Sequence, residues 1–181
     1  MRIYKIVGIV LSAMLLLASC TNSGLEKKKV KIAYANWLEG IAMSHLAKVV
    51  LEEHGYEVEL QNADLAPIFV SMSGKKSDVF LDAWLPITMK DYMDQYGDSI
   101  EFLGEVYGDL EEIHAIAWKG FSEKDPFAAE FFGNIKLTTE ELSSFMTAMK
   151  DARMDEEEIA RKWRDEHRQL VDSWIPKSEN K

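Results

Sequence analysis

Acidic and aromatic side chains stand at the ends of three candidate strands in the first half of the sequence. Because the carboxyl ends of parallel strands meet at one edge of an open α/β sheet, where ligands bind, we expect these side chains to share one rim. Two tryptophans on such a rim are suited to form two walls of a cage that recognises a quaternary ammonium group. The candidate rim residues are Trp37, Glu39, Asn62, Asp64, Asp82 and Trp84.

The two rim tryptophans also have a simpler interpretation. In a cage, Trp37 and Trp84 would each contribute about 0.5–2 kcal/mol to the binding of a cation. Buried aromatic rings, however, most often serve to fill a core. The spacing of the two residues does not decide between a ligand cage and ordinary packing.

The elements that must position this rim alternate between strand-like and helix-like patterns. Short connections between such segments favour a parallel, doubly wound sheet with right-handed crossovers. Gly55 is expected to end the first helix. The predicted strands cover residues 30–35, 56–60 and 77–83, and the predicted helices cover residues 41–54, 65–72 and 86–96.

The second half of the chain has one predicted strand, residues 112–118, followed only by helical patterns. Asp125 before a proline and Asp155 are typical helix starts, and Thr138 with Glu141 forms a capping box. The expected helices cover residues 125–133, a segment from 138, residues 155–167 and residues 170–175. The fold class is therefore α/β, with a mostly parallel sheet and a helical C-terminal segment.

The first twenty residues have the pattern of an export signal. Arg2 and Lys5 precede an apolar run over residues 6–17, which is too short to span a bilayer permanently but suits a signal peptide. The run ends in Leu-Ala-Ser before Cys20, which resembles the bacterial lipobox, in which the cysteine is lipidated. The alternative is a free thiol after an ordinary signal peptide. Cys20 is the only cysteine in the chain, so no disulfide is expected.

These patterns divide the chain into four parts. The polar stretch after Cys20 lacks periodicity and suits a tether, and a lipid with more than one acyl chain would anchor the protein stably to a membrane outside the cytoplasm. The predicted parts are a signal peptide at 1–19, a tether at 20–29, one α/β lobe at 30–175 and a tail at 176–181.

The length and charge of the chain limit the number of domains and the kinds of partner that we expect. The 181 residues suffice for one compact domain. The chain has 21 Lys and Arg against 31 Asp and Glu, a net charge of −10. A nucleic-acid partner is therefore not expected, because such binding needs a cationic surface that replaces phosphate counterions.

Motifs for catalysis or metal binding are not found. The four histidines are scattered, and the sequence has no metal-binding, P-loop or nucleophile-elbow pattern. We therefore expect no cofactor, no metal and no enzymatic activity.

Three blocks of the sequence resemble the glycine betaine and proline betaine substrate-binding proteins of ABC importers. Residues 30–60 contain NWLEGIA, and residues 78–92 contain DAWLP. Residues 111–132, which include EEIHAIAWKGF, are similar to the closing segment of the same family. The resemblance covers most of the chain after the tether, and it implies one lobe of a periplasmic-binding-protein type II fold.

The resemblance implies roles for individual residues. Trp37 and Trp84 would belong to the aromatic cage around the trimethylammonium group. At position 89, relatives place a histidine near the carboxylate of the ligand, whereas this chain has Met89, which offers no hydrogen-bond donor. Trp118 stands where relatives tend to have a basic residue; we interpret it as structural, with an exposed aromatic as the alternative.

The resemblance also implies that a lobe is missing. Family members have two lobes that close on the ligand, and the second is inserted between the matched segments. Here residues 102–109 run directly into residues 110–121, so the second lobe is absent near Asp109 and Leu110. A lobe has its own core and can fold alone, but hinge closure cannot occur within this chain.

Three hypotheses follow for the function. The first is a substrate-binding lobe for glycine betaine or a related betaine or choline-type solute, serving an ABC permease, with affinity reduced by the missing lobe. The second is an interaction lobe that docks on the permease or on a partner lobe without binding solute. The third is an α/β enzyme of unknown substrate. A homodimer that brings two rims together is a further possibility, which the sequence leaves open.

Overall fold

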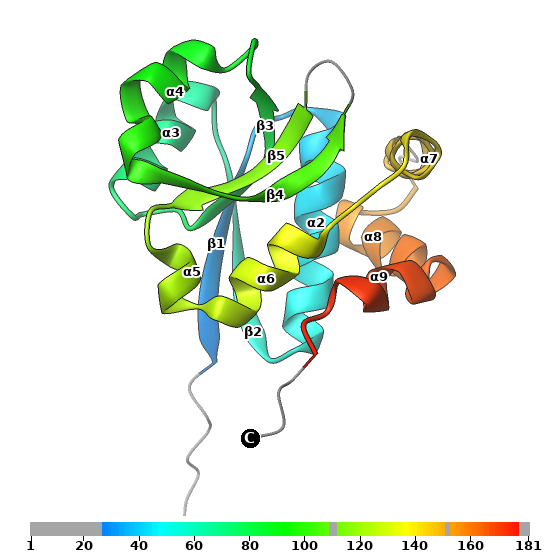
Figure 1. Ribbon diagram of the computed structural model, residues 1–181. Helices are drawn as coiled ribbons and strands as arrows, with labels where there is room; N and C mark the ends of the chain where they lie inside the picture. Colours follow the sequence, from blue (N-terminus) through cyan, green and yellow to red (C-terminus); the bar gives the residue numbers. More distant parts are fainter. Residues whose placement is uncertain (1–26, 109–111, 151–152, 178–181) are drawn as a thin grey trace, which may run out of the picture.

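The computed structural model describes residues 27–108, 112–150 and 153–177. It contains one five-stranded sheet in the order β2-β1-β3-β5-β4, with helices on both faces (Figure 1). The strands are β1 (Lys28–Tyr34), β2 (Tyr56–Asn62), β3 (Val79–Leu85), β4 (Ile100–Gly108) and β5 (Glu112–Trp118). The helices are α2 (Leu38–Glu53), α3 (Leu65–Ser73), α4 (Lys90–Tyr96), α5 (Phe121–Lys124), α6 (Pro126–Asn134), α7 (Thr139–Ala148), α8 (Glu156–Glu166) and α9 (Arg168–Trp174), with a short 3₁₀ turn η1 (Gly97–Ser99).

The sheet is mixed, which corrects the prediction of a mostly parallel sheet. β1 pairs in parallel with β2 and with β3, as the alternation of strand and helix predicts. β5 pairs antiparallel with both β3 and β4. The prediction was wrong because β4 was missed: its polar residues and Gly104 obscure the alternation, and its pairing with β5 is interrupted by two register shifts.

Gly104 has a packing role that explains why a strand contains it. A Cβ placed there would lie 2.6 Å from the carbonyl oxygen of Gly133. Only glycine allows β4 and α6 to approach each other this closely. The same residue that hides the strand from a pattern search therefore lets the helix pack on it.

Two hydrophobic cores lie on the two faces of the sheet, so the helices cover both sides, as expected for a doubly wound arrangement (Figure 1). The larger core joins the sheet to α2 and the C-terminal helices, and the smaller one joins it to α3 and α4. Predicted helix signals are confirmed: Thr138 and Glu141 form the capping box, Asp125 and Asp155 cap α6 and α8, and Gly55 has a φ of 85°.

Some element boundaries differ from the predictions. The helix predicted over residues 86–96 begins only at Lys90, because residues 86–89 form a turn in which the Met89 N–H donates to the Trp84 carbonyl oxygen. The predicted tether overlaps the first strand, since β1 begins at Lys28. The signal peptide, Cys20 and the expected site of the missing lobe at Asp109 and Leu110 lie outside the described residues.

The β4–β5 hairpin stands where the second lobe was expected to be inserted. Gly108 and Glu112 are partners across it, so the strands on the two sides of residues 109–111 remain paired up to this point. In the part of the chain that the structure describes, no helix has the length and apolar character needed to cross a membrane.

A bulge in β3 determines which residues face α2. Phe80 pairs with Ile116 and Ala83 pairs with His114, so β3 has one extra residue between these pairs. As a result Leu81 and Asp82 both point to the face covered by α2, whereas strict alternation would send them to opposite faces. The bulge thereby brings Asp82 to the first turn of α2.

Candidate functional site

Three of the predicted rim residues meet around an open hollow of about 290 Å³, which we call the rim hollow. Trp37 precedes α2, and Trp84 comes from β3. Glu39, in the first turn of α2, and Thr88, in the turn after β3, complete the lining. The arrangement confirms that Trp37, Glu39 and Trp84 share one rim. Both indoles are partly buried: each packs against the hydrophobic core and also lines the hollow.

The local chain path explains why Trp37 reaches this rim. The Trp37 N–H donates to the Ala35 carbonyl oxygen at 2.8 Å, which turns the chain sharply after β1. The Trp37 carbonyl then accepts the first helical hydrogen bond of α2 from Ile41 at 2.9 Å. The indole therefore projects from the junction of a strand and a helix, the usual position of a ligand-binding residue in an α/β sheet.

Asp82 lies beneath the rim and holds Trp84. The Trp84 Nε1–H donates to Asp82 Oδ1 at 2.9 Å. Asp82 is only 1% exposed, and its second oxygen, Oδ2, has no hydrogen-bond partner. Oδ2 packs against the backbone of Gly40, where a Cβ would lie 2.8 Å away. Gly40 therefore makes room for a carboxyl group under the first turn of α2.

The surroundings of Asp82 favour its protonated form. Burial, and secondarily the negative charge of Glu39, raise the pKa of Asp82 to about 8, although the hydrogen bond from Trp84 acts in the opposite direction. No Lys, Arg or His is among the described residues that line the rim hollow. The rim thus combines two indole faces with acidic groups that have no cationic neighbour there.

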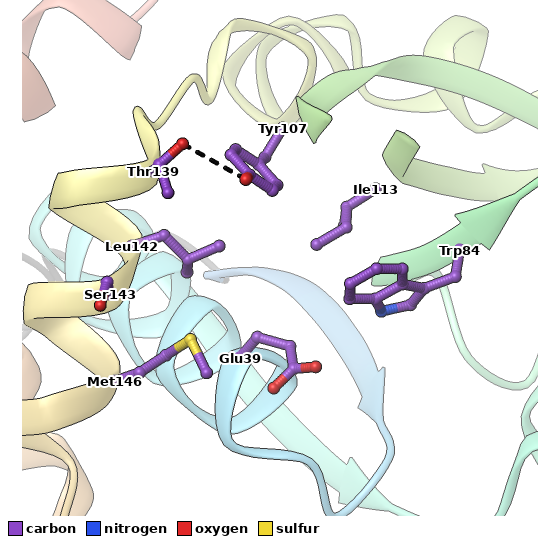
Figure 2. Close-up of a pocket in the computed structure, with 8 residues that line it drawn as sticks. All are labelled: Glu39, Trp84, Tyr107, Ile113, Thr139, Leu142, Ser143 and Met146. Atoms are coloured by element: carbon purple, nitrogen blue, oxygen red, sulfur yellow. Dashed lines mark hydrogen bonds between the residues drawn. The ribbon is translucent and has the colours of Figure 1, made fainter. Parts of the chain in front are cut away.

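A second hollow, the inner hollow, shares Trp84 and Glu39 with the first and has a volume of about 200 Å³ (Figure 2). Tyr107 from β4 faces it and accepts a hydrogen bond from Thr139 at 3.3 Å. Leu142 and Met146 project into it from α7 (Figure 2). Its lining also includes Ile113 and Ser143. An aromatic, apolar hollow next to a carboxylate suits the methyl groups of an organic cation.

Other predicted rim residues do not join the two hollows. Asn62 is exposed at the end of β2, and Asp64 is exposed just before α3, without a capping hydrogen bond from its side chain. Met89 is fully buried in the smaller core, on the opposite face of the sheet from α2. These residues share the end of the sheet but not the lining of either hollow.

The exposed-aromatic alternative for Trp118 was wrong. The indole is buried and donates its N–H to Asp78 Oδ1 at 2.9 Å. Lys75 lies over its ring, 4.2 Å from the centroid. Trp118 is thus a structural residue. The described residues contain no group of three or more His, Cys, Asp or Glu side chains arranged to hold a metal ion.

Several lining residues were not predicted. Tyr107 was not predicted because the strand that carries it, β4, was not recognised. Thr88 was not predicted because residues 86–89 were expected to be helical. The spacing of Leu142 and Met146 on one face of α7 was visible in the sequence, but only the fold places that face opposite Trp84.

The comparisons with known proteins agree with this geometry. The family model described as the substrate-binding domain of the ABC-type glycine betaine transport system matches residues 28–108 and 102–166. A relative, the glycine betaine/carnitine transport binding protein GbuC of Listeria monocytogenes, is 32% identical over 102 residues, which is 55% of this chain and 32% of GbuC. The match thus spans about a third of the length of that relative.

Solved structures show the same fold. Lactococcal OpuAC, in its closed conformation with glycine betaine, has a TM-score of 0.76 and 18% identity, with 82% of this chain and 100% of that chain covered. A choline-binding protein of an ABC transporter, in complex with choline, has a TM-score of 0.74 and 14% identity, with 81% and 91% covered. They support the expected periplasmic-binding-protein type II architecture.

The family-model match falls into two segments that meet in β4, which fits the expectation that a lobe is lacking between them. The matched segments together cover more than half of the residues, from the start of β1 to the end of α8. The chain belongs to the family of substrate-binding domains of ABC-type glycine betaine transport systems, a family of solute-binding components rather than enzymes.

Proposed function

We propose that this chain is a solute-binding lobe for an ABC importer and that it binds the quaternary ammonium group of glycine betaine, choline or a similar solute at the rim hollow. One observation carries the proposal: Trp37 and Trp84 line the same open hollow with Glu39, and no cationic residue is among its described lining residues. Indole faces attract a cation, and the nearby carboxylate adds to that attraction.

The affinity of this lobe alone is expected to be low. A missing lobe removes a third aromatic wall and the donors for a carboxylate, which together contribute about 3–5 kcal/mol. That loss corresponds to roughly 10²- to 10³-fold weaker binding, or more, than a complete two-lobed protein achieves. Met89 supplies no compensating donor, because a thioether cannot donate and the side chain lies in the smaller core, outside both hollows.

The cellular setting belongs to the same proposal. An exported chain lipidated at Cys20 would be held to a membrane outside the cytoplasm, where a permease subunit is its partner. The tether would let the lobe reach that permease while the lipid keeps it near. This setting serves the uptake of compatible solutes, that is, osmoprotection.

The test is a fluorescence titration of the purified chain with choline and with glycine betaine through the millimolar range. We expect saturable quenching that weakens in Trp37→Phe and Trp84→Phe. The uncharged carbon analogue of choline, with the same shape and no charge, is the matched control ligand and should quench far less. Equal quenching by the analogue, or none by either cation, would contradict the proposal.

A second candidate function is an interaction lobe that docks on the permease or on a partner lobe without solute. The observation that favours it is the exposure of Ile87, which is 70% exposed in the turn between Trp84 and α4. Ile87 precedes Thr88, which lines the rim hollow, so a partner docked over the rim would cover this side chain. Co-purification with a second-lobe protein or the permease, unchanged by ligand and reduced by Ile87→Glu, would favour this candidate.

A further inference from the structure

Asp82 is a buried acid whose two oxygens have different surroundings. Oδ1 accepts the Trp84 indole N–H at 2.9 Å, while Oδ2 has no hydrogen-bond partner. The residue is only 1% exposed, and Gly40 covers Oδ2. An unpartnered carboxyl oxygen in such a site disfavours a negative charge, so the group is held in its neutral form until a positive charge comes near.

The charged groups around Asp82 come from few elements. From α2, Glu39 faces it and adds a negative charge. On β5, His114 and Glu112 contact each other at 2.8 Å beside β3. The β1 residues that pair with β3 are Ile32 and Ala33, which carry no charge. The α7 residues that face Trp84 across the inner hollow are also uncharged.

We infer that Asp82 is the positioning residue of Trp84, and that a quaternary ammonium group held against this indole binds with release of the Asp82 proton. The inference rests on the proposed function of the rim. In the neutral state the carboxyl oxygen Oδ1 fixes the plane of the indole. When the cation arrives, the Asp82 O–H bond breaks, the proton passes to solvent, and the resulting carboxylate balances the charge of the ligand.

This coupling determines how the affinity depends on pH. Burial and Glu39 raise the pKa of Asp82 to about 8, so the free protein is mostly protonated there at neutral pH. A nearby cation favours the ionised form and lowers that pKa. Each unit by which the ligand lowers it corresponds to a tenfold gain in affinity as pH rises. We expect the affinity for choline to rise roughly tenfold from about pH 6 to about pH 9.

The experiment measures choline binding by the purified full-length chain across this pH range, together with proton release in two buffers of different ionisation enthalpy. Asp82→Asn retains a carbonyl oxygen that can accept the indole N–H but has no proton to release. Its affinity should become independent of pH, with no proton released. Asp98→Asn, on the exposed 3₁₀ turn η1, makes the same substitution away from the rim and should behave as the parent.

Asp82→Ala tests the positioning role separately. It removes the acceptor, so we expect weaker binding at every pH and a changed near-ultraviolet spectrum of Trp84. Asp82→Asn should restore the spectrum, and should restore binding to the level that the parent shows near pH 6. Circular dichroism of the backbone checks that each variant folds. If Asp82→Asn keeps the parental pH profile and proton release, the linkage is wrong. If Asp82→Ala binds and absorbs as the parent does, the positioning role is wrong.

The two proposals fail in different ways. Choline binding that weakens in Trp84→Phe but shows no dependence on pH would leave the proposed function standing and overturn the inference. Absence of binding by choline and glycine betaine at every pH in the millimolar range would overturn both.

Discussion

Two carboxyl groups that contact the same helix have pKa values displaced in opposite directions. Glu157 of α8 contacts Lys48 of α2 at 2.7 Å and Arg161 at 2.6 Å, and these hydrogen bonds lower its pKa to about 2. Asp82 of β3 lies under the first turn of α2 with no cation near it, and burial raises its pKa to about 8. The difference comes from the partners that each acid has in the fold.

The two acids lie in regions that differ in how their charges are balanced. Around Lys48 the charges of α2 and α8 satisfy each other, so this region holds two helices together and needs no ligand. At the rim, Asp82 and Glu39 have no cation among the described residues that line the hollow. An acid that its own fold leaves without a counter-charge is where a positively charged ligand gains most.

The largest expected effect concerns stability at Asp82. The folded state holds a proton that the unfolded chain releases above its ordinary pKa of 3.8. The parent protein therefore loses stability as pH rises from about 4 to about 8, and loses no more above that, with a total of about 6 kcal/mol at about 1.4 kcal/mol for each pKa unit. Asp82→Asn should lack this loss. In urea unfolding, the free energy of unfolding of the variant should therefore rise relative to that of the parent as pH rises. A constant difference at all pH values would contradict the displaced pKa.

A smaller effect is expected from the ring of Trp84. Trp84→Ala should weaken choline binding by about 1–2 kcal/mol, roughly 5- to 30-fold, because an indole face and its contacts are lost. Trp84→Phe keeps a ring without the N–H and should lose less. Calorimetric titration measures both, and equal losses would show that the hydrogen bond to Asp82, not the ring face, dominates.

Substitution of Glu157, the acid that is paired with two cations, should change stability only modestly. Because Glu157 is partly exposed, Glu157→Gln should lower the free energy of unfolding at neutral pH by only about 0.5–1 kcal/mol. Its folded pKa lies below its unfolded value of 4.5, so this contribution is present above about pH 4.5 and disappears as pH falls to about 2. Urea unfolding at low and high salt measures it, with Glu130→Gln, at an exposed position of α6, as the matched control. Equal effects of the two substitutions would argue against the pairing.

The smallest expected effect is that of Glu39 on affinity. Glu39→Gln removes one partly exposed carboxylate from both hollows and should weaken choline binding about threefold, less at high salt. It should also shift the pH profile toward lower pH, because Glu39 contributes to the raised pKa of Asp82. Titration at two salt concentrations is the measurement, and an unchanged pH profile would show that the two acids are not coupled.

Much of the fold could be predicted because its signals are local. Caps at Asp125, Thr138 and Asp155 determine helix starts through hydrogen bonds to nearby backbone groups. The strand β4 could not be predicted, because Gly104 is present for a contact with Gly133, which is distant in the sequence. A pattern search reads periodicity along the chain and has no access to such contacts.

Part of the candidate site could also be predicted from the sequence, and part could not. Residue types and strand order were enough to bring Trp37, Glu39 and Trp84 to one rim, because parallel strands end at a common edge. They were not enough to separate those residues from Met89, which packs in the core on the other face. Asp64 likewise follows a strand at this edge yet lines neither hollow.

The sequence by itself determined the family, the rim tryptophans and the alternation of strand and helix, because these depend on residue types and on spacing along the chain. The tertiary structure decided what Asp82 is. The bulge in β3 turns its carboxyl group toward Gly40 and Trp84, where it is buried without a cation. Whether an acid is paired or isolated depends on which distant segments pack around it, and that is settled only when the sheet and α2 come together.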